Sequence, residues 1–307
     1  MSSTLRFVYF GLPLGALILR KAGFFPRVIG IGHPDAPGRR RLWRGTEGPA
    51  PLILGRPDLT QTQIVRAIES AEPDALLSWF WPRKLPPNVL ALPRLGAFGV
   101  HPSLLPRWRG PDPCFWAIHA GDRITGVTLH RLDQEYDTGH IVAQQRVAID
   151  PKDTSFSLAR RLDRPSLALL VDCARRLSAG EPLTGTPQPT RGVTCANAPD
   201  DETLRIVWER SVDEILRLIR AAAPYPGASC MLDSEIVEVV EAEAFPRPLP
   251  QALVAGEAIQ AREGVIVCAE NGGILLGRVR RDDGSLLSGV AITTLFRAGL
   301  AWLPEAL

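Results

Sequence analysis

Short apolar runs alternate with segments of helical periodicity along the first part of the chain. Residues 5–10 form a β-rich run that ends at Gly11, residues 14–22 favour a helix, and residues 28–32 form a second run. A strand, a helix and another strand in this order are typical of a parallel sheet, so the pattern predicts an α/β domain. Further strands are predicted at residues 76–80, 97–100, 126–132 and 141–149.

Two longer helices are predicted between and after these strands. Thr60 and Gln63 have the spacing of a capping box, and the apolar residues that follow them recur at helical intervals. Residues 155–177 are mostly helical, with a kink or an interruption expected at Pro165 because proline has no amide hydrogen to donate.

The last third of the chain has a different pattern. Residues 180–199 are rich in Pro, Thr and Gly and lack apolar periodicity, which is typical of a linker, and a helical segment then ends at Pro224. The rest consists of short strands and turns, the pattern of a small β-barrel: residues 236–240, 265–269, 274–279 and 290–295. The prediction is a Rossmann-like, mostly parallel sheet domain (residues 1–180), a linker (residues 181–203) and an OB-like β-barrel domain (residues 204–307).

Composition narrows the class of protein only slightly. The formal net charge is +2, so the whole surface is not that of a nucleic-acid binder, although a local basic patch remains open. The five cysteines are scattered without a C-x-x-C pair, which favours free thiols in a reducing compartment over a metal site or disulfides. Pro13 interrupts the apolar N-terminal segment, and no stretch is long enough to span a membrane. A cytoplasmic location without a membrane partner is expected, and the sequence makes no prediction about oligomeric state.

A histidine and an aspartate are the candidate catalytic residues. His101 ends a predicted strand, and Asp137 opens the Asp-Thr-Gly sequence of a loop between two further strands. Open α/β sheets bind ligands at the carboxyl edge of their strands, where these side chains are expected to meet. A carboxylate beside an imidazole stabilises the imidazolium and so favours proton transfer near neutral pH. From these residues alone, a structural histidine and an ordinary turn remain the alternatives.

The region from residue 100 to residue 141 resembles the folate-dependent formyltransferase family, which includes glycinamide ribonucleotide, methionyl-tRNA and nucleotide-sugar formyltransferases. The positions that carry the resemblance are His101-Pro102-Ser103-Leu104-Leu105-Pro106, Arg109-Gly110, Gly121, Gly126-Val127-Thr128 and Asp137-Thr138-Gly139. The likeness continues upstream through Phe10-Gly11, Pro34-Asp35 and Pro73-Asp74. Residues 223–228 resemble the entry to the C-terminal barrel of the methionyl-tRNA members, so most of the chain is covered.

This resemblance implies a reaction and a site. The donor is expected to be 10-formyltetrahydrofolate, the acceptor an amine, and no metal is involved. By the resemblance, His101 assists collapse of the tetrahedral intermediate and stabilises its oxyanion, while Asp137 orients and charges that histidine. The expected folate-binding residues are Arg83, Lys84, Leu85, Ser103, Leu104, Leu105 and Pro106.

One site position departs from the family pattern. The family has an asparagine two residues before the histidine, directed at the formyl oxygen, and this chain has Gly99 there. Loss of such a donor typically costs roughly 10²–10³ in rate. Three alternatives follow: slower formyl transfer, transfer of a different unit from 5,10-methylenetetrahydrofolate, or folate binding without turnover. Release of formate by hydrolysis of the same donor is a further alternative.

Two opposing charge patterns bear on the acceptor. Residues 33–44, with arginines at 39, 40, 41 and 44, resemble the basic loop that methionyl-tRNA members use against the acceptor stem. From Arg205 onwards, however, ten arginines and no lysine face fourteen acidic residues, a formal charge of −4. A domain that grips phosphates should be basic. The charge therefore predicts a small-molecule amine acceptor, with methionyl-tRNA as the alternative.

Overall fold

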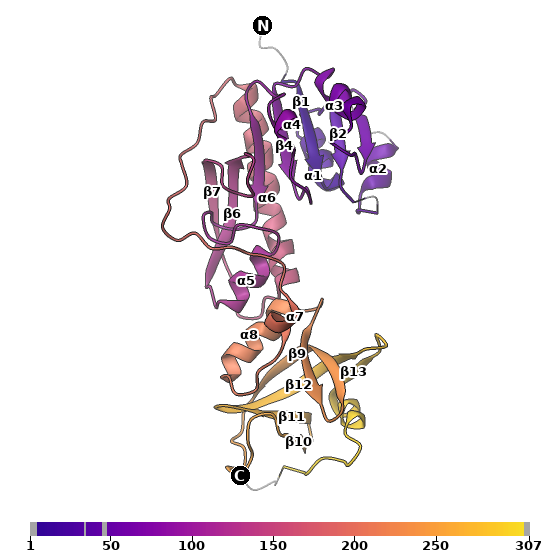
Figure 1. Cartoon of the computed structure of the whole chain (residues 1–307), viewed down its shortest axis with the longest axis vertical. Helices are drawn as coiled ribbons and strands as arrows, with labels where there is room; N and C mark the ends of the chain where they lie inside the picture. Colours follow the sequence, from indigo (N-terminus) through magenta and orange to yellow (C-terminus); the bar gives the residue numbers. More distant parts are fainter. Residues whose placement is uncertain (1–4, 34, 45–47, 304–307) are drawn as a thin grey trace. The chain divides into compact units, whose positions relative to one another are not determined.

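The computed structural model describes residues 5–33, 35–44 and 48–303, which form two compact units (Figure 1). The first unit comprises the residues up to Pro113, Ile124–Ala148 and Arg160–Asn197. The second unit comprises Cys114–Arg123, Ile149–Ala159 and the residues from Ala198 on. The domain and linker boundaries expected from the sequence stay a prediction.

A seven-stranded sheet forms the first unit, in the order β3-β2-β1-β4-β5-β6-β7. Neighbouring strands from β3 to β5 are parallel, whereas β6 is antiparallel to both β5 and β7. The predicted mostly parallel sheet is confirmed. Its strands are β1 (Phe7–Gly11), β2 (Val28–Ile31), β3 (Leu52–Gly55), β4 (Ala75–Trp79), β5 (Ala97–His101), β6 (Ile124–Arg131) and β7 (Ile141–Ala148).

The central strands pack tightly because they are apolar on both faces. Every residue of β1, β4 and β5 is buried, as expected for a sheet covered on both sides. Gly11 ends β1 with φ of +151°, and a Cβ there would lie 1.9 Å from the carbonyl oxygen of Trp79. Only glycine fits this close approach of β1 to β4, which shapes the edge of the sheet that carries the site.

Short helices and one long helix accompany this sheet. The helix α6 is continuous through Pro165, so the predicted interruption is absent, and Figure 1 shows α6 running along one face of the sheet. The predicted capping box is also wrong, because α3 begins at Thr62 and the Thr60 hydroxyl donates to Asp58 instead. The helices are α1 (Pro13–Lys21), α2 (Arg39–Trp43), α3 (Thr62–Glu69), α4 (Pro87–Leu90) and α6 (Ser155–Ser178), whose residues from Arg160 on belong to this unit.

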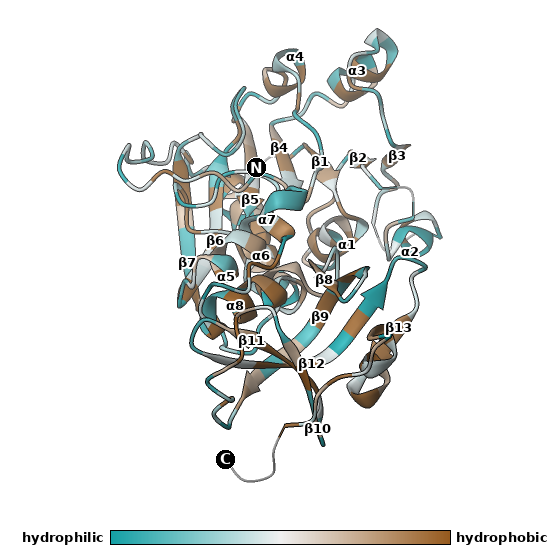
Figure 2. Cartoon of the chain, turned by 60° about the horizontal axis from the view of Figure 1, so that its bottom comes forward, coloured by the Kyte–Doolittle hydropathy of each residue, from teal (hydrophilic) through white to brown (hydrophobic). Residues whose placement is uncertain are grey.

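The second unit is built on a six-stranded antiparallel sheet, in the order β10-β11-β12-β9-β8 with β13 beside β12. Apolar and polar residues alternate along β9, with Val237 and Val239 buried, and Figure 2 shows the same banding. The elements are α5 (Pro113–His119), α7 (Asp201–Leu204), α8 (Val212–Ala222), β8 (Ala228–Leu232), β9 (Glu235–Phe245), β10 (Ala258–Ala261), β11 (Gly264–Ala269), β12 (Gly272–Arg281) and β13 (Leu286–Ser288).

One predicted strand of this unit is a helix. Residues 290–295 fall within a 3₁₀ helix over Gly289–Leu295. The hydroxyls of Thr293 and Thr294 donate to the carbonyls of Val290 and Ala291, three residues earlier in each case. These local hydrogen bonds favour a tight turn over an extended strand.

Two general expectations can be compared with the described residues. No helix among them is long and apolar enough to cross a membrane. All five cysteines are free thiols; Cys195 is exposed and the other four are buried.

Candidate active site

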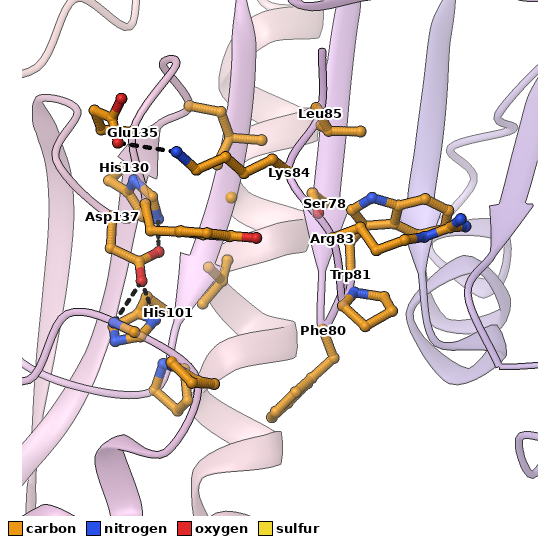
Figure 3. Close-up of a pocket in the computed structure, with 18 of the residues that line it drawn as sticks. Ser78, Phe80, Trp81, Arg83, Lys84, Leu85, His101, His130, Glu135 and Asp137 are labelled. Carbon is orange, nitrogen blue, oxygen red and sulfur yellow. Dashed lines mark hydrogen bonds and ion pairs between the residues drawn. The ribbon is translucent and has the colours of Figure 1, made fainter. Parts of the chain in front are cut away.

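A pocket of about 630 Å³ opens at the carboxyl edge of β4 and β5, in the size range of small-ligand sites (Figure 3). His101, the last residue of β5, lines this pocket together with Pro102. The sheet edge predicted from the sequence is therefore the edge that is hollowed. The residues that line the pocket also include Ser78, Trp81, Arg83, Lys84, Leu85, Gly99, Gly110, His130, Leu132, Glu135, Tyr136 and Asp137.

The Asp137 carboxylate lies between two imidazoles (Figure 3). Its Oδ2 is 3.4 Å from Nδ1 of His101, and its Oδ1 is 3.6 Å from Nε2 of His130. The two rings are edge to face, with centroids 6.5 Å apart. The predicted pairing of His101 with Asp137 is present, and the second histidine is an addition that the sequence analysis did not include.

Both ring nitrogens of His101 face protein groups. Nε2 lies 2.7 Å from the carbonyl oxygen of Trp108, which can only accept, so Nε2 carries a hydrogen. Nδ1 faces the Asp137 carboxylate, and the ring is buried, with 6% of its surface exposed. These contacts fix the orientation of the ring between a carbonyl and a carboxylate.

The backbone around Asp137 is strained and heavily braced. Asp137 has φ of +56°, in the left-handed region that few residues other than glycine adopt. Its Oδ2 accepts a hydrogen bond of 2.9 Å from the Gly110 amide, and Gln188 donates to the carbonyls of Asp137 and Gly139 at 2.7 and 2.8 Å. Unfavourable backbone conformations persist at sites where surrounding contacts impose them, and here they aim the carboxylate at the imidazoles.

Gln188 belongs to a segment that contacts two loops of the site. Its Oε1 accepts from the Arg109 guanidinium at 2.7 Å, and the Thr194 hydroxyl accepts from the Trp108 amide at 2.8 Å. Arg109 and Cys195 also form a short parallel bridge. Residues 186–197, although within the predicted linker, thus hold both the loop after His101 and the loop of Asp137.

His130 is the penultimate residue of β6 and is buried. Its Nδ1 lies 2.9 Å from the Arg131 carbonyl oxygen, so Nδ1 carries the hydrogen of the neutral ring. Burial lowers the pKa of the His130 imidazole below its usual range, with the His101 ring acting in the same direction and the Asp137 carboxylate opposing it. The neutral ring then presents a bare Nε2 on the side of the carboxylate.

Gly99 lies on β5 opposite Ser78 of β4 and lines the pocket. A Cβ at this position would be 2.7 Å from Cδ2 of Leu132 and 3.5 Å from Nε2 of His130. The volume next to residue 99 is therefore bordered by these two side chains. Glycine itself supplies no side-chain donor to that volume.

Three of the predicted folate-binding residues lie in one wall of the pocket. Arg83 stacks over the Trp81 ring at 5.0 Å, Lys84 pairs with Glu135 at 2.9 Å, and Leu85 is buried. The indole Nε1 of Trp81 is buried and has no hydrogen-bond partner among the described residues. An indole with an unsatisfied donor, a buried leucine and two cationic side chains together suit a heterocycle that carries polar edges.

The other four predicted folate-binding residues do not line this pocket. Ser103 and Leu105 are buried, and the Thr128 hydroxyl donates to the Ser103 carbonyl at 2.6 Å and accepts from the Leu105 amide at 3.1 Å. Leu104 and Pro106 are half-buried outside the pocket. This segment fixes the loop after His101. Because its residues do not line the pocket, the pocket geometry does not support the expected contact with folate.

A metal ion at the site would need a group of side chains that could bind it. Within residues 5–33, 35–44 and 48–303, no group of three His, Cys, Asp or Glu side chains is arranged to hold a metal ion.

The first unit combines a mostly parallel sheet with a pocket, and an antiparallel unit follows it in the chain. This is the organisation of a two-domain, ligand-binding enzyme. A family model for formyl transferase matches residues 48–173, and a model for the formyl transferase C-terminal domain matches residues 200–296. Relatives match over nearly the whole length. The chain belongs to the formyl transferase family and is an enzyme of that family.

The relatives include methionyl-tRNA formyltransferases. One from Ralstonia nicotianae is 34% identical over 94% of this chain and 94% of its own, and one from Burkholderia ambifaria is 33% identical over 94% and 93%. A structure of HypX from Aquifex aeolicus in complex with tetrahydrofolic acid has a TM-score of 0.67 at 21% identity, covering 98% of this chain and 49% of that chain. Phosphoribosylglycinamide formyltransferase from Bacillus halodurans has a TM-score of 0.51 at 25% identity, over 58% and 98%.

Proposed function

We propose that this enzyme transfers the formyl group of 10-formyltetrahydrofolate to the amine of methionyl-tRNA. The observation that carries the proposal is the 34% identity to a methionyl-tRNA formyltransferase across 94% of both chains. The charge of the C-terminal domain favours a small-molecule amine instead. The full-length relatives favour methionyl-tRNA. Similarity to an enzyme with a small acceptor is weaker, at 14% identity for the sugar formyltransferase WlaRD.

The pocket suits the proposed donor. The wall of Trp81 and Leu85 provides apolar area and an unsatisfied indole donor for a pterin ring, with Lys84 at the rim. His101, Asp137 and His130 lie at the opposite side, where the formyl carbon has to meet the amine. The amine attacks the formyl carbon, a tetrahedral oxyanion forms, and the bond to N10 of the folate breaks. His101, held in place by the Trp108 carbonyl, is proposed to stabilise that oxyanion electrostatically.

The acidic C-terminal unit does not conflict with an RNA acceptor. Four of its arginines are paired with carboxylates: Arg247 with Glu263, Arg278 with Glu241, Arg280 with Glu238 and Arg281 with Glu235. The exposed arginines of the first unit are better placed to meet phosphates. Arg40, Arg41 and Arg44 are exposed on and just after α2, which follows the pocket residue His33 by a short loop.

The exposed arginines of α2 supply the first test. In the triple variant Arg40→Ala, Arg41→Ala and Arg44→Ala, we expect weaker binding of methionyl-tRNA and a flatter dependence of affinity on salt. The slope of log K against log salt should fall by about one for each phosphate that the variant no longer neutralises. Filter binding or fluorescence titration at several salt concentrations measures both quantities, and formylation of methionyl-tRNA by the wild type measures the reaction.

A matched variant removes the same charge elsewhere. Arg66, Arg262 and Arg297 are exposed, and their replacement by alanine should leave the salt slope near that of the wild type. Equal slopes in the two triple variants would remove α2 from the RNA interface. Turnover of small amines together with no formylation of methionyl-tRNA would overturn the proposed acceptor.

A further inference from the structure

Of the two histidines at the site, His130 has the ring nitrogen with the longest approach to a protein group among the described residues. His101 uses Nε2 against the Trp108 carbonyl at 2.7 Å and turns Nδ1 to Asp137 at 3.4 Å. His130 uses Nδ1 against the Arg131 carbonyl at 2.9 Å, and its Nε2 makes only the 3.6 Å approach to Asp137. Direct proton exchange with a substrate is therefore easier at His130 than at His101.

The Nε2 atom of His130 also adjoins the position at which this chain departs from its family. A Cβ on residue 99 would lie 3.5 Å from this atom, so the imidazole borders the volume into which an asparagine side chain would extend. Gly99 lines the pocket, and the Leu132 side chain, 2.7 Å from that Cβ position, occupies part of this volume. A group in the volume next to residue 99 therefore lies beside the proton-accepting Nε2 of His130 and not beside an amide.

We propose that His130 is the proton carrier of the formyl transfer, a role that rests on the proposed function. The neutral Nε2 accepts a proton from the attacking amine as its nitrogen bonds to the formyl carbon. The resulting imidazolium faces the oxyanion and then donates the proton to N10 as the carbon–N10 bond breaks. One proton moves from the amine to the folate, and His130 ends in its starting state.

The charged neighbours of His130 suit this cycle. Asp137 stabilises the imidazolium once it forms, and Asp133 acts in the same direction from the loop after β6. Burial of the ring, together with the neighbouring His101 ring, lowers the pKa of His130 and so favours its neutral form between turnovers. The Arg131 carbonyl accepts from Nδ1, so in the neutral ring the lone pair belongs to Nε2.

The tautomer of His130 can be tested without any turnover. Long-range ¹H–¹⁵N spectra of the ring nitrogens at neutral pH should show His130 protonated at Nδ1 and bare at Nε2, with assignment by the His130→Gln variant. A proton on Nε2 at neutral pH overturns the proposal, whichever acceptor the enzyme uses.

Kinetics test the role itself. His130→Gln should lower kcat about 10²- to 10⁴-fold with little change in KM for 10-formyltetrahydrofolate, the scale of a positioned acid–base group. Wild-type activity should be full above the lowered pKa of His130 and fall below it, and this acidic limb should vanish in His130→Gln. Added imidazole should restore part of the rate in His130→Ala.

The control is a histidine outside the pocket. His140 is exposed and its Nδ1 lies 3.3 Å from the Thr184 carbonyl oxygen, so His140→Gln should retain both rate and pH profile. Formylation by the wild type with an unchanged rate and profile in His130→Gln overturns the role of His130 and leaves the proposed function standing. A wild type that formylates no methionyl-tRNA overturns the acceptor, and the spectra still decide the tautomer.

Discussion

Replacing Asp137 by alanine should lower the rate of formyl transfer about 10²- to 10⁴-fold, the usual contribution of a positioned acid–base group. The carboxylate touches both imidazoles, so its loss frees the His101 ring and removes the counter-charge for a protonated His130. His101→Ala should cause a loss of similar size. Steady-state kinetics with saturating 10-formyltetrahydrofolate measure both effects.

The double variant is the more informative measurement. Because the two residues act as one unit, His101→Ala combined with Asp137→Ala should be little slower than either single variant. Circular dichroism and thermal unfolding establish that each variant is folded. Wild-type-like turnover in either single variant, or fully multiplicative losses in the double variant, would contradict the assignment of this pair.

An amide restored at residue 99 should raise the rate only when space is made for it. Gly99→Asn alone places a Cβ 2.7 Å from Cδ2 of Leu132, so that side chain has to move before the amide can point at the formyl oxygen. Gly99→Asn combined with Leu132→Ala removes the obstacle. One such donor contributes about 2.7–4 kcal/mol to stabilisation of the transition state, so the gain in kcat can approach roughly 10²–10³.

Leu132→Ala alone is the control, since it enlarges the pocket without adding a donor. A double variant that is slower than this control with 10-formyltetrahydrofolate would contradict oxyanion stabilisation at residue 99. Parallel assays with 5,10-methylenetetrahydrofolate address the other donor. Turnover of that donor by the wild type, lost in the double variant, would favour transfer of a different one-carbon unit.

The pairing of His101 with Asp137 was predicted from the sequence, but strand topology alone does not produce it. Because β6 is antiparallel to β5, with Arg131 opposite Phe98, the loop after β6 begins beside the start of β5 and has to turn back before Asp137 can reach His101. The Asp-Thr-Gly sequence also has a geometric reason. A Cβ on Gly139 would lie 1.9 Å from the Arg131 carbonyl oxygen, which is also the acceptor for His130.

The position of His130 at the site was not predictable in the same way. Alternation along β6 assigns it to the same face as Thr128, but the ladder with β7 is irregular between Leu129 and His130, and the strand ends at Arg131. A period of two no longer fixes direction across such an irregularity. The importance of this side chain also depends on its distance from residue 99, which has no Cβ in this chain. No sequence pattern contains that distance.

Gln188 and the segment after His101 were hard to place from the sequence for opposite reasons. Gln188 lies 51 residues after Asp137 in a segment without periodicity, so nothing local signals its contacts. Ser103 and Leu105 stand in a strongly patterned motif, yet hydrogen bonds to Thr128 turn that motif inward. A motif specifies which residues are needed together, and the packing around them decides which ones reach a ligand.

The segment of residues 186–197 has a practical consequence for engineering acceptor specificity by exchanging C-terminal domains. A chimera joined at residue 180 would bring in a foreign sequence at Gln188 and Thr194, and with it remove the hydrogen bonds that set the Asp137 and Trp108 loops. A junction after Asn197 keeps these native partners beside the catalytic half. Fusion points in this enzyme are therefore better chosen by the contacts of the connecting segment than by its composition.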